Sequence, residues 1–475
     1  MNATPVSTAR AALTVLTALS LSALALPAAA QSATPPAAAA CPSGLPEGTR
    51  CLNGRDYLGA YYWIAVPRDW QPETGVLVVH AHGGPALGEP TLARSTGDLQ
   101  RWSVMVRAGH AWAGSSFRQG GVELLAAAED TERLRQLTVA TIGQPRRTLL
   151  HGQSWGAGVA ARMAERYVTP DIDPRRTAPG PLPYDAVLLT SGVLAGGTRS
   201  YDVRLDLRVV YQALCQNHPK PDESAYPLWM GLPPDIKLTR AELASRVDTC
   251  LGVQRKPAER SAAQQQRLTT LTRVVKLPEH EILSHLNWAT WHFQDITMRK
   301  LKGRNPFGNE GVQYSGSDDD ATLNRDVLRY RADPDALAAL AQDTDPTGRL
   351  LLPTLTLHGI DDQTAFVELE SHFRETVTEA GAADQLVQVY TADHAHSYTS
   401  DAHYVSAVEA LLDWVDKGDK PSAARLAQRC KTLPTQWQPA SGCRIRVDYQ
   451  PAPLDSRVPQ RRRPPAATAP AIKRP

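Results

Sequence analysis

Short apolar segments alternate with segments of helical spacing over two stretches of this 475-residue chain. Apolar runs that predict buried strands lie at residues 75–82, 110–117, 147–152, 184–190, 350–358 and 386–391. Segments that predict helices lie at residues 121–142, 155–167, 365–380 and 401–416. Because strands that alternate with helices pair in parallel, we expect an α/β fold with a mostly parallel, doubly wound sheet covered on both faces.

The alternation stops between the two stretches. Residues 196–347 are mostly helical or irregular in pattern, so we expect a large, mainly helical cap or lid inserted at one edge of the sheet. The core would then comprise residues 41–195 and 348–450, the second part ending in a disulfide-bonded extension. Aromatic residues of the insertion either form its own core or line a pocket for substrate; they are Trp229, Trp288, Trp291, Phe293, Phe307 and Tyr314.

The two ends of the chain do not have the pattern of a folded domain. Residues 1–30 contain an uncharged apolar run that ends in small residues, which predicts a signal peptide cleaved after Ala30. An uncleaved anchor is the alternative, but the run is shorter than the ~20 residues of a typical span. Residues 31–40 predict a flexible spacer, and the basic, proline-rich residues 451–475 predict a disordered tail. We therefore expect a secreted or periplasmic protein without stable membrane insertion.

Charge and cysteine content narrow the class of protein further. The formal net charge of +2 argues against a nucleic-acid partner, which usually selects a strongly basic surface. The six cysteines of an exported chain predict disulfides. Proximity in sequence favours the pairs Cys41–Cys51, Cys215–Cys250 and Cys430–Cys443. No CxxC pair is present to suggest zinc, and nothing in the sequence indicates the oligomeric state.

The most informative motif is Gly152-Gln153-Ser154-Trp155-Gly156, which lies between an apolar strand and an alanine-rich helix. A serine on such a strand–turn–helix junction is exposed for nucleophilic attack, and the flanking glycines remove side chains that would clash in the sharp turn. The free N–H groups at the helix start point at the negative charge that develops on a substrate. We predict that Ser154 is a nucleophile and that Trp155 contributes one oxyanion-hole donor.

A glycine pair follows the strand at residues 75–82. The sequence His82-Gly83-Gly84-Pro85 allows a backbone N–H group to approach an oxyanion closely, so Gly83 and Gly84 are predicted to complete the oxyanion hole. A plain glycine turn is the alternative interpretation.

An acid and a base follow the last two predicted strands. Asp361 and Asp362 come after the strand that ends at residue 358, and we favour Asp362 as the acid, although either could instead cap the next helix. His394 and His396 follow the last strand, and we favour His396 because small Ala395 precedes it and suits a tight turn.

The remaining histidines at strand ends are expected to be packed or hydrogen-bonded without a catalytic role. They include His80, His151 and His358.

These four motifs, in the order Ser, Asp, His, resemble those of the α/β-hydrolase superfamily over residues 55–195 and 348–418. The His-Gly-Gly-Pro and Ser-Trp-Gly motifs are also similar to those of the proline iminopeptidase family, which has a helical cap. Two features depart from the pattern: Ala395 stands where the superfamily usually has glycine, and residues 196–347 match no cap that would carry a substrate class over. The resemblance implies an acyl-enzyme mechanism that uses Ser154, His396 and Asp362, without a metal or an organic cofactor.

Four functions are compatible with these residues. The first is a secreted serine hydrolase that cleaves carboxylic esters, small or polymeric. The second is an exported peptidase or amidase with the same triad, which would need a carboxylate of the insertion, such as Glu223, Glu279 or Glu281, to bind a free amino group. The third is a metal-dependent hydrolase built on the pairs His80/His82 and His394/His396. The fourth is a binding protein that has the fold but no activity.

Overall fold

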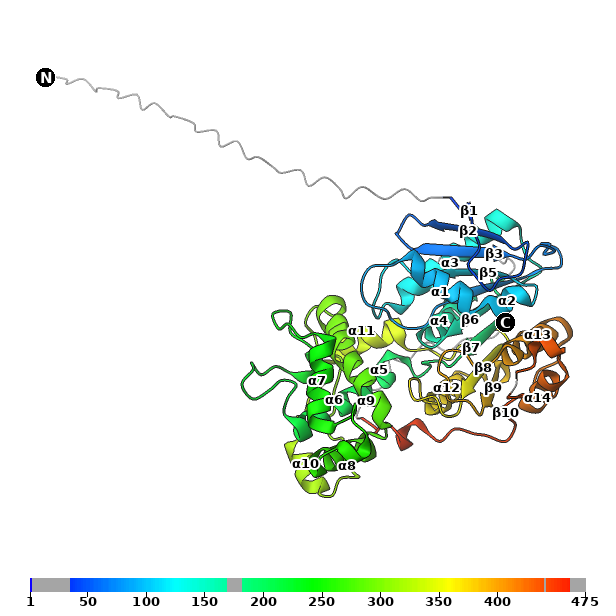
Figure 1. The fold of residues 1–475 in the computed structure, drawn as a ribbon. Helices are drawn as coiled ribbons and strands as arrows, with labels where there is room; N and C mark the ends of the chain where they lie inside the picture. The colour runs from blue at the N-terminus through cyan, green and yellow to red at the C-terminus, as the bar shows by residue number, and fades with distance from the viewer. Residues whose placement is uncertain (2–34, 169–181, 440, 462–475) are drawn as a thin grey trace.

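The structure is a computed structural model that describes residue 1 and residues 35–168, 182–439 and 441–461. The described strands form one sheet in the order β1-β2-β3-β5-β4-β6-β7-β8-β9-β10 (Figure 1). The strands are β1 (Ala37–Ala39), β2 (Arg50–Arg55), β3 (Tyr61–Val66), β4 (Val76–Ala81), β5 (Ala111–Ser115), β6 (Arg147–Gln153), β7 (Ala186–Thr190), β8 (Thr354–Gly359), β9 (Leu386–Thr391) and β10 (Ile445–Arg446). The six strands from β4 to β9 pair in parallel, whereas β1, β2, β3 and β10 join antiparallel at the edges. The prediction of a mostly parallel sheet is confirmed.

The strand order reverses at β4. This strand pairs with β5 on one side and with β6 on the other, although β5 and β6 both follow it in the chain. In open α/β sheets, ligands bind beyond the carboxyl ends of the strands at such a switch point. The first turns after β4 and β6 are the two glycine-containing motifs, so the topology brings both to this edge of the sheet.

Helices cover both faces of the sheet because alternate side chains of each strand point to opposite sides. On β4, Leu77 and Val79 belong to one buried apolar cluster, and Val76 and Val78 belong to the other. The first cluster includes residues of helices α3 (Leu124–Ile142), α4 (Trp155–Val168) and α12 (Glu368–Glu379). The second includes residues of α1 (Leu92–Arg101), α2 (Ser103–Arg107), α13 (Asp401–Lys417) and α14 (Ala423–Thr432). The sheet is therefore doubly wound, as predicted.

A helical segment lies between β7 and β8 and forms a separate body of green helices beside the sheet (Figure 1). Its helices are α5 (Gly196–Ser200), α6 (Asp202–Cys215), α7 (Arg240–Leu251), α8 (Ala262–Val275), α9 (Glu279–Asn287), α10 (Asp320–Asp326) and α11 (Pro334–Thr344). Two π-helical stretches, η3 (Trp288–His292) and η4 (Asp295–Lys300), continue α9. Short 3-10 turns complete the described chain: η1 (Leu228–Met230), η2 (Pro257–Glu259), η5 (Ala383–Gln385), η6 (Thr435–Trp437) and η7 (Leu454–Ser456).

Most of the aromatic residues of this segment pack into its own core. Phe293, Phe307 and Tyr314 are buried, and Phe293 stacks on Phe307 with ring centroids 4.2 Å apart. Trp229 and Trp291 are partly buried against the same cluster. The core interpretation of these residues therefore holds, with Trp288 as the exception described below.

The ends of the described chain are more ordered than their composition predicts. Within the predicted spacer, Ala37–Ala39 form β1 and pair with β2, next to the disulfide that joins Cys41 to Cys51. Alanine has little preference for strands, so no local pattern indicated this pairing. The predicted signal peptide lies outside the described residues, apart from Met1.

The prediction of a disordered tail is wrong for residues 451–461. Leu454 and Val458 are buried, and Arg461 forms ion pairs with Asp202 and Asp206 of α6. A segment that is polar on its own becomes ordered here because its counter-ions lie on a distant helix. The predicted tail beyond residue 461 lies outside the described part of the chain.

Three disulfides join the cysteines in the predicted pairs. The Cα atoms are 5.3 Å apart in Cys41–Cys51, 5.7 Å in Cys215–Cys250 and 6.0 Å in Cys430–Cys443. The disulfide prediction is therefore confirmed. None of the helices in the described residues has both the length and the hydropathy needed to cross a bilayer.

Candidate active site

Ser154 lies on a strained turn between β6 and α4. Its backbone φ is +57°, its N–H donates to the carbonyl of Thr190 at 2.9 Å, and its carbonyl accepts from Val193 N–H at 3.0 Å. A Cβ on Gly152 would lie 2.2 Å from the Gly156 carbonyl oxygen, and one on Gly156 would lie 2.1 Å from that of Ala81. Both flanking positions therefore require glycine, and the strained serine is held by the backbone on either side of it.

His396 connects Ser154 to Asp362. Its Nε2 lies 2.8 Å from Ser154 Oγ, and its Nδ1 lies 2.7 Å from Asp362 Oδ2. The three side chains come from loops at the carboxyl ends of β6, β8 and β9 and are separated by as many as 242 residues in the chain. In this arrangement the Nε2 atom can take the hydroxyl proton while the acid holds Nδ1–H, which selects one tautomer of the ring.

Asp362 is buried and fully hydrogen-bonded. Its other oxygen, Oδ1, accepts from the backbone N–H groups of Thr364 at 2.9 Å and Ala365 at 3.0 Å. Burial alone would raise the pKa of Asp362, but the hydrogen bonds and charges of His396 and His358 hold that pKa well below its usual range. The side chain is therefore an anion that can stabilise a positive charge on His396. Asp362 also has the capping role that was the alternative interpretation, because Oδ1 accepts from two backbone N–H groups of the turn before α12.

The competing residues lie apart from this chain of contacts. His394 Nδ1 lies 3.5 Å from Asp361 Oδ2, and their side chains are 79% and 49% exposed. The sequence left both pairs open, and only the pair His396 and Asp362 contacts Ser154 in the structure. His394 and Asp361 contact each other on the solvent-exposed surface instead.

The predicted oxyanion loop packs directly against the serine turn. A Cβ on Gly83 would lie 2.8 Å from the Gln153 carbonyl oxygen, and Gly84 has a φ of +73°. The Arg94 guanidinium donates to the carbonyl of Gly83, so the N–H of Gly84 in the same trans peptide points the opposite way. Trp155 begins α4, and its N–H therefore has no intrahelical acceptor. The predicted residues thus lie next to Ser154, Gly83 by packing against Gln153 and Trp155 by following the serine in the chain.

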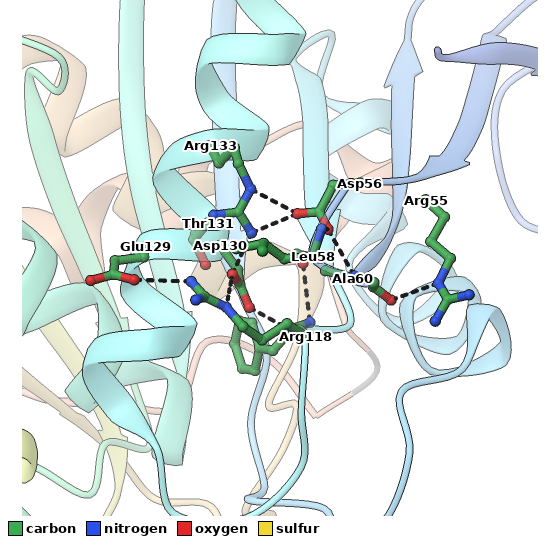
Figure 2. Close-up of polar contacts among 12 residues, drawn as sticks. Arg55, Asp56, Leu58, Ala60, Arg118, Glu129, Asp130, Thr131 and Arg133 are labelled. Atoms are coloured by element: carbon green, nitrogen blue, oxygen red, sulfur yellow. Dashed lines mark hydrogen bonds and ion pairs between the residues drawn. The ribbon is translucent and has the colours of Figure 1, made fainter. Parts of the chain in front are cut away.

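A buried ion-pair network fixes the loop after β5, which supports the oxyanion loop (Figure 2). The backbone N–H and Nε of Arg118 both donate to Asp130 at 2.6 Å, and Arg133 bridges Asp130 to Asp56. The Asp130 side chain is fully buried on α3. The network holds the residue before Arg118, Phe117, in a left-handed conformation with a φ of +59°. The ring of this phenylalanine stacks on His82, beside the oxyanion loop.

His358 is a residue whose relation to the site was missed by sequence reasoning. Its Nδ1 lies 3.0 Å from Glu370 Oε1, its Nε2 lies 3.4 Å from Asp362 Oδ2, and all three side chains are fully buried. Glu370 also accepts from Thr356 Oγ1 at 2.8 Å and from Gln388 Nε2 at 2.7 Å. Asp362 therefore contacts two histidines, His396 and His358. Apart from the short distance between them along the chain, no sequence pattern indicates that residues 358, 362 and 370 contact one another.

The charge of His358 should make the free energy of unfolding fall as pH rises through the alkaline range. Burial would lower the pKa of His358, but its hydrogen bonds to Asp362 and Glu370 raise it to about 10. A raised pKa in the folded state stabilises the fold fully below the unfolded-state pKa near 6.5, and this contribution is lost as pH rises through about 10. We expect His358→Gln to lower the free energy of unfolding on the order of 4 kcal/mol at pH ~6.

The difference between this variant and the wild type should shrink between pH ~6.5 and ~10, measured by urea unfolding at each pH. His372→Gln serves as the control, since the His372 Nδ1 atom lies 3.8 Å from the exposed carboxylate of Glu375. A difference that does not change with pH would show that His358 is uncharged in the folded protein.

The other histidines have mainly structural surroundings. His80 Nδ1 lies 3.0 Å from His151 Nδ1, and burial lowers the pKa of both rings. The two proposed His-x-His pairs do not converge, because His80 packs on Trp112 whereas His396 contacts the serine. Among the described residues, the only three clustered side chains with metal-ligand atoms are His403, Cys430 and Cys443, and these two cysteines are bonded to each other. Nothing in this geometry favours the metal hypothesis.

The strand order and the serine turn at the switch point define an α/β-hydrolase fold, as the resemblance implied. No protein-family model matches the chain, and no curated protein matches it either. The solved structures similar to this chain are distant. An esterase from Aspergillus oryzae has 11% identity and a TM-score of 0.42, covering 82% of this chain and 86% of its own.

Two further solved structures are similar at the same level. The ligand-bound rice cell wall degrading esterase LipA from Xanthomonas oryzae has 15% identity and a TM-score of 0.37, with 77% of this chain and 89% of that chain covered. A puromycin hydrolase has 14% identity and a TM-score of 0.35, with 80% of this chain and 39% of that chain covered. These likenesses are too distant to carry a substrate over.

Proposed function

We propose that this protein is an exported serine hydrolase that cleaves carboxylic esters. The observation that supports it is the continuous hydrogen-bonded chain from Ser154 Oγ through His396 to Asp362, with distances of 2.8 and 2.7 Å. It lies on a strained serine turn, next to the Gly83–Gly84 loop and the first residue of α4. Such an arrangement is costly to build, and it supports acyl transfer better than a purely structural role.

In the proposed reaction, His396 removes the hydroxyl proton as Ser154 Oγ attacks the ester carbonyl carbon. The oxyanion of the tetrahedral intermediate accepts hydrogen bonds from the N–H groups of Trp155 and Gly84. Asp362 stabilises the imidazolium, which then gives its proton to the departing alcohol. Water, activated by the same histidine, attacks the acyl-enzyme and releases the carboxylic acid.

Two features support a capping role for the helical segment and export of the protein. Ser154 is only 4% exposed, so the neighbouring helical segment would act as a cap that shapes the substrate site. Export, with cleavage after Ala30, agrees with the three disulfides, because such bonds persist mainly in oxidising compartments.

The substrate class is tested by assaying p-nitrophenyl acetate, longer p-nitrophenyl esters and amino-acid p-nitroanilides in parallel. We expect the esters to be hydrolysed and the anilides to be cleaved poorly. Faster turnover of an amino-acid anilide than of every ester would replace the esterase proposal with the peptidase alternative. No turnover of either class, together with no labelling by a fluorophosphonate, would leave only the binding-protein hypothesis.

One observation favours the peptidase alternative. Of the three acidic residues considered for binding a free amino group, Glu223 pairs with Arg246 and Glu279 pairs with Arg260. Glu281 has no ion-pair partner among the described residues. Burial raises the pKa of this half-buried side chain, and the charge of His280 opposes this effect. A carboxylate of α9 without an ion-pair partner in the described chain can bind an ammonium group.

Glu281→Gln tests this alternative directly. If the substrate has a free amino terminus, this change should lower kcat/KM for an amino-acid p-nitroanilide at least about tenfold and leave p-nitrophenyl acetate within about twofold. Glu279→Gln is the matched control on the same helix, since its partner Arg260 already occupies the carboxylate. An equal loss on both substrates would instead indicate a structural role for Glu281.

A further inference from the structure

Arg204 is a buried arginine without a carboxylate partner among the described residues. It lies in α6 and is 3% exposed, with its guanidinium carbon 4.7 Å from the Tyr201 ring centroid and 4.2 Å from that of Trp288. One terminal nitrogen donates to the carbonyl of Ser200, whereas Nε has no hydrogen-bond acceptor in the described chain. A buried guanidinium normally has an anionic partner, because removing its hydration is costly.

The acidic residues near this end of α6 are engaged elsewhere. Asp202 pairs with Arg199 and Arg461, and Asp206 pairs with Arg461 and accepts from Tyr314. Arg204 lies on the same helix between these paired residues. Carboxylates are therefore present near Arg204, but each of them is paired with another arginine.

The unpartnered arginine lines a cavity of about 10 Å³, the space of one water molecule, which any bound anion would have to widen. Val193 and Thr364 line the same cavity. The N–H of Val193 donates to the Ser154 carbonyl at 3.0 Å, and the N–H of Thr364 donates to Asp362 Oδ1 at 2.9 Å. One wall is therefore continuous with the serine turn and another with the loop of the triad acid. α5 and α6, which carry the arginine, lead directly from β7 into the helical segment (Figure 1).

Further unsatisfied polar atoms surround the guanidinium. Ser200 Oγ is buried without a partner among the described residues and lines the same cavity. The Nδ1 atoms of His285 and His292 are likewise buried and unpaired. Burial and the charge of Arg204 lower the pKa of these rings to about 3 and about 4, so both are neutral near pH ~7.

The two histidines are tied to the catalytic loops by their other nitrogens. His285 Nε2 donates to the Gln363 carbonyl at 3.1 Å, and His292 Nε2 donates to the Pro85 carbonyl at 3.0 Å. Each ring contacts Trp288, one of the two aromatic residues against the guanidinium. With both rings neutral, the positive charges at this junction are Arg204 and Arg457, and Arg457 pairs with Glu368 at 3.2 Å.

We propose that Arg204 binds a carboxylate of the substrate, so that the preferred substrates are esters that carry a free carboxyl group. This inference rests on the proposed hydrolase function. The planar guanidinium can bind a carboxylate through two parallel hydrogen bonds, and Ser200 Oγ can donate a third. Tyr201 and Trp288 hold the guanidinium plane in place. Tyr201 also packs edge-on against Trp155, with ring centroids 6.4 Å apart, which links the subsite to the oxyanion hole.

The carboxylate can belong to either part of the ester, and two matched pairs of substrates distinguish these sources. Mono-p-nitrophenyl glutarate carries it on the acyl side, and its methyl ester is the neutral counterpart. p-Acetoxybenzoate carries it on the leaving group, and its methyl ester is again the neutral counterpart. We expect the wild type to prefer the anionic member of one pair by at least about tenfold in kcat/KM.

Arg204→Met should abolish this preference, because the aliphatic side chain still fills the space between the two rings but cannot bind a carboxylate. Arg240→Met is the matched control: it removes an exposed arginine of the same segment that stacks on Trp291 at 4.8 Å, with the same change in net charge. This control should keep the preference.

Equal turnover of both members of both pairs by the wild type would overturn the proposal, as would a preference that survives in Arg204→Met. If Arg204→Met does not fold, the test is inhibition of p-nitrophenyl butyrate hydrolysis by small carboxylates, measured with the wild-type protein. Glutarate or benzoate should inhibit competitively, whereas glutaramide or benzamide should not, and the absence of this difference would reject the subsite. Labelling of Ser154 by a fluorophosphonate reports on the hydrolase function separately, since labelling without any anion preference would reject only the subsite.

Discussion

Replacing Ser154 by alanine is expected to lower kcat/KM for a p-nitrophenyl ester by at least about 10⁴-fold. The loss follows from the geometry, because Ser154 Oγ is the atom held 2.8 Å from His396 Nε2. Without the hydroxyl no acyl-enzyme can form, and the remaining groups act only by binding and polarising the substrate. The measurement is steady-state hydrolysis of p-nitrophenyl acetate or butyrate.

The fold should tolerate this change, since the side chain of Ser154 makes no other hydrogen bond in the described structure than the one to His396. Circular dichroism and thermal unfolding serve as the control for folding. Mass spectrometry after fluorophosphonate treatment should find the label on Ser154 in the wild type and no label in Ser154→Ala. A label on another serine, or turnover that survives the substitution, would show that the hydrolytic centre lies elsewhere.

Replacing His396 by alanine is expected to have a loss of similar size, at least about 10⁴-fold in kcat/KM. His396 is the only base within hydrogen-bond distance of Ser154 Oγ among the described residues, and Asp362 holds its other nitrogen at 2.7 Å. Removal of the imidazole leaves the serine hydroxyl without a proton acceptor and leaves the buried Asp362 without the hydrogen bond from Nδ1. The assay is the same p-nitrophenyl ester hydrolysis.

His394→Ala is the matched control for this prediction. The two histidines lie two positions apart in the same loop, yet the His394 side chain is 79% exposed and pairs with Asp361. We expect this control to change kcat/KM by no more than about twofold. A large loss from His394→Ala with a small one from His396→Ala would reverse the assignment of the base.

The fold followed from patterns that are local in the sequence. Apolar strands of valine and leucine, such as residues 76–81, alternate with amphipathic helices, and this alternation is a property of neighbouring residues. The serine motif depends on an adjacent strand, an adjacent helix and two glycines, all within a few residues. The three disulfides likewise joined cysteines no more than 35 residues apart.

Local sequence patterns predicted only part of the candidate site. Sequence reasoning left Asp361 with Asp362, and His394 with His396, as competing pairs, because neighbouring residues in a loop have similar local surroundings. Tertiary structure separates them: one pair meets Ser154 across three strand ends, and the other lies in solvent. The contact of His358 with the triad acid was missed because it depends on how α12 packs beneath the loop.

The sequence by itself determined the sheet architecture, the serine turn and the cysteine pairing, since each depends on residues that are close in the chain. Only the tertiary structure decided which charges are paired. Arg461 orders the predicted disordered tail by contacting Asp202 and Asp206, more than 250 residues away. Arg204, two residues from each of these acids, has no carboxylate partner in the described chain. The physical reason is that the energy of a buried charge depends on its neighbours in space, and local sequence does not specify those neighbours.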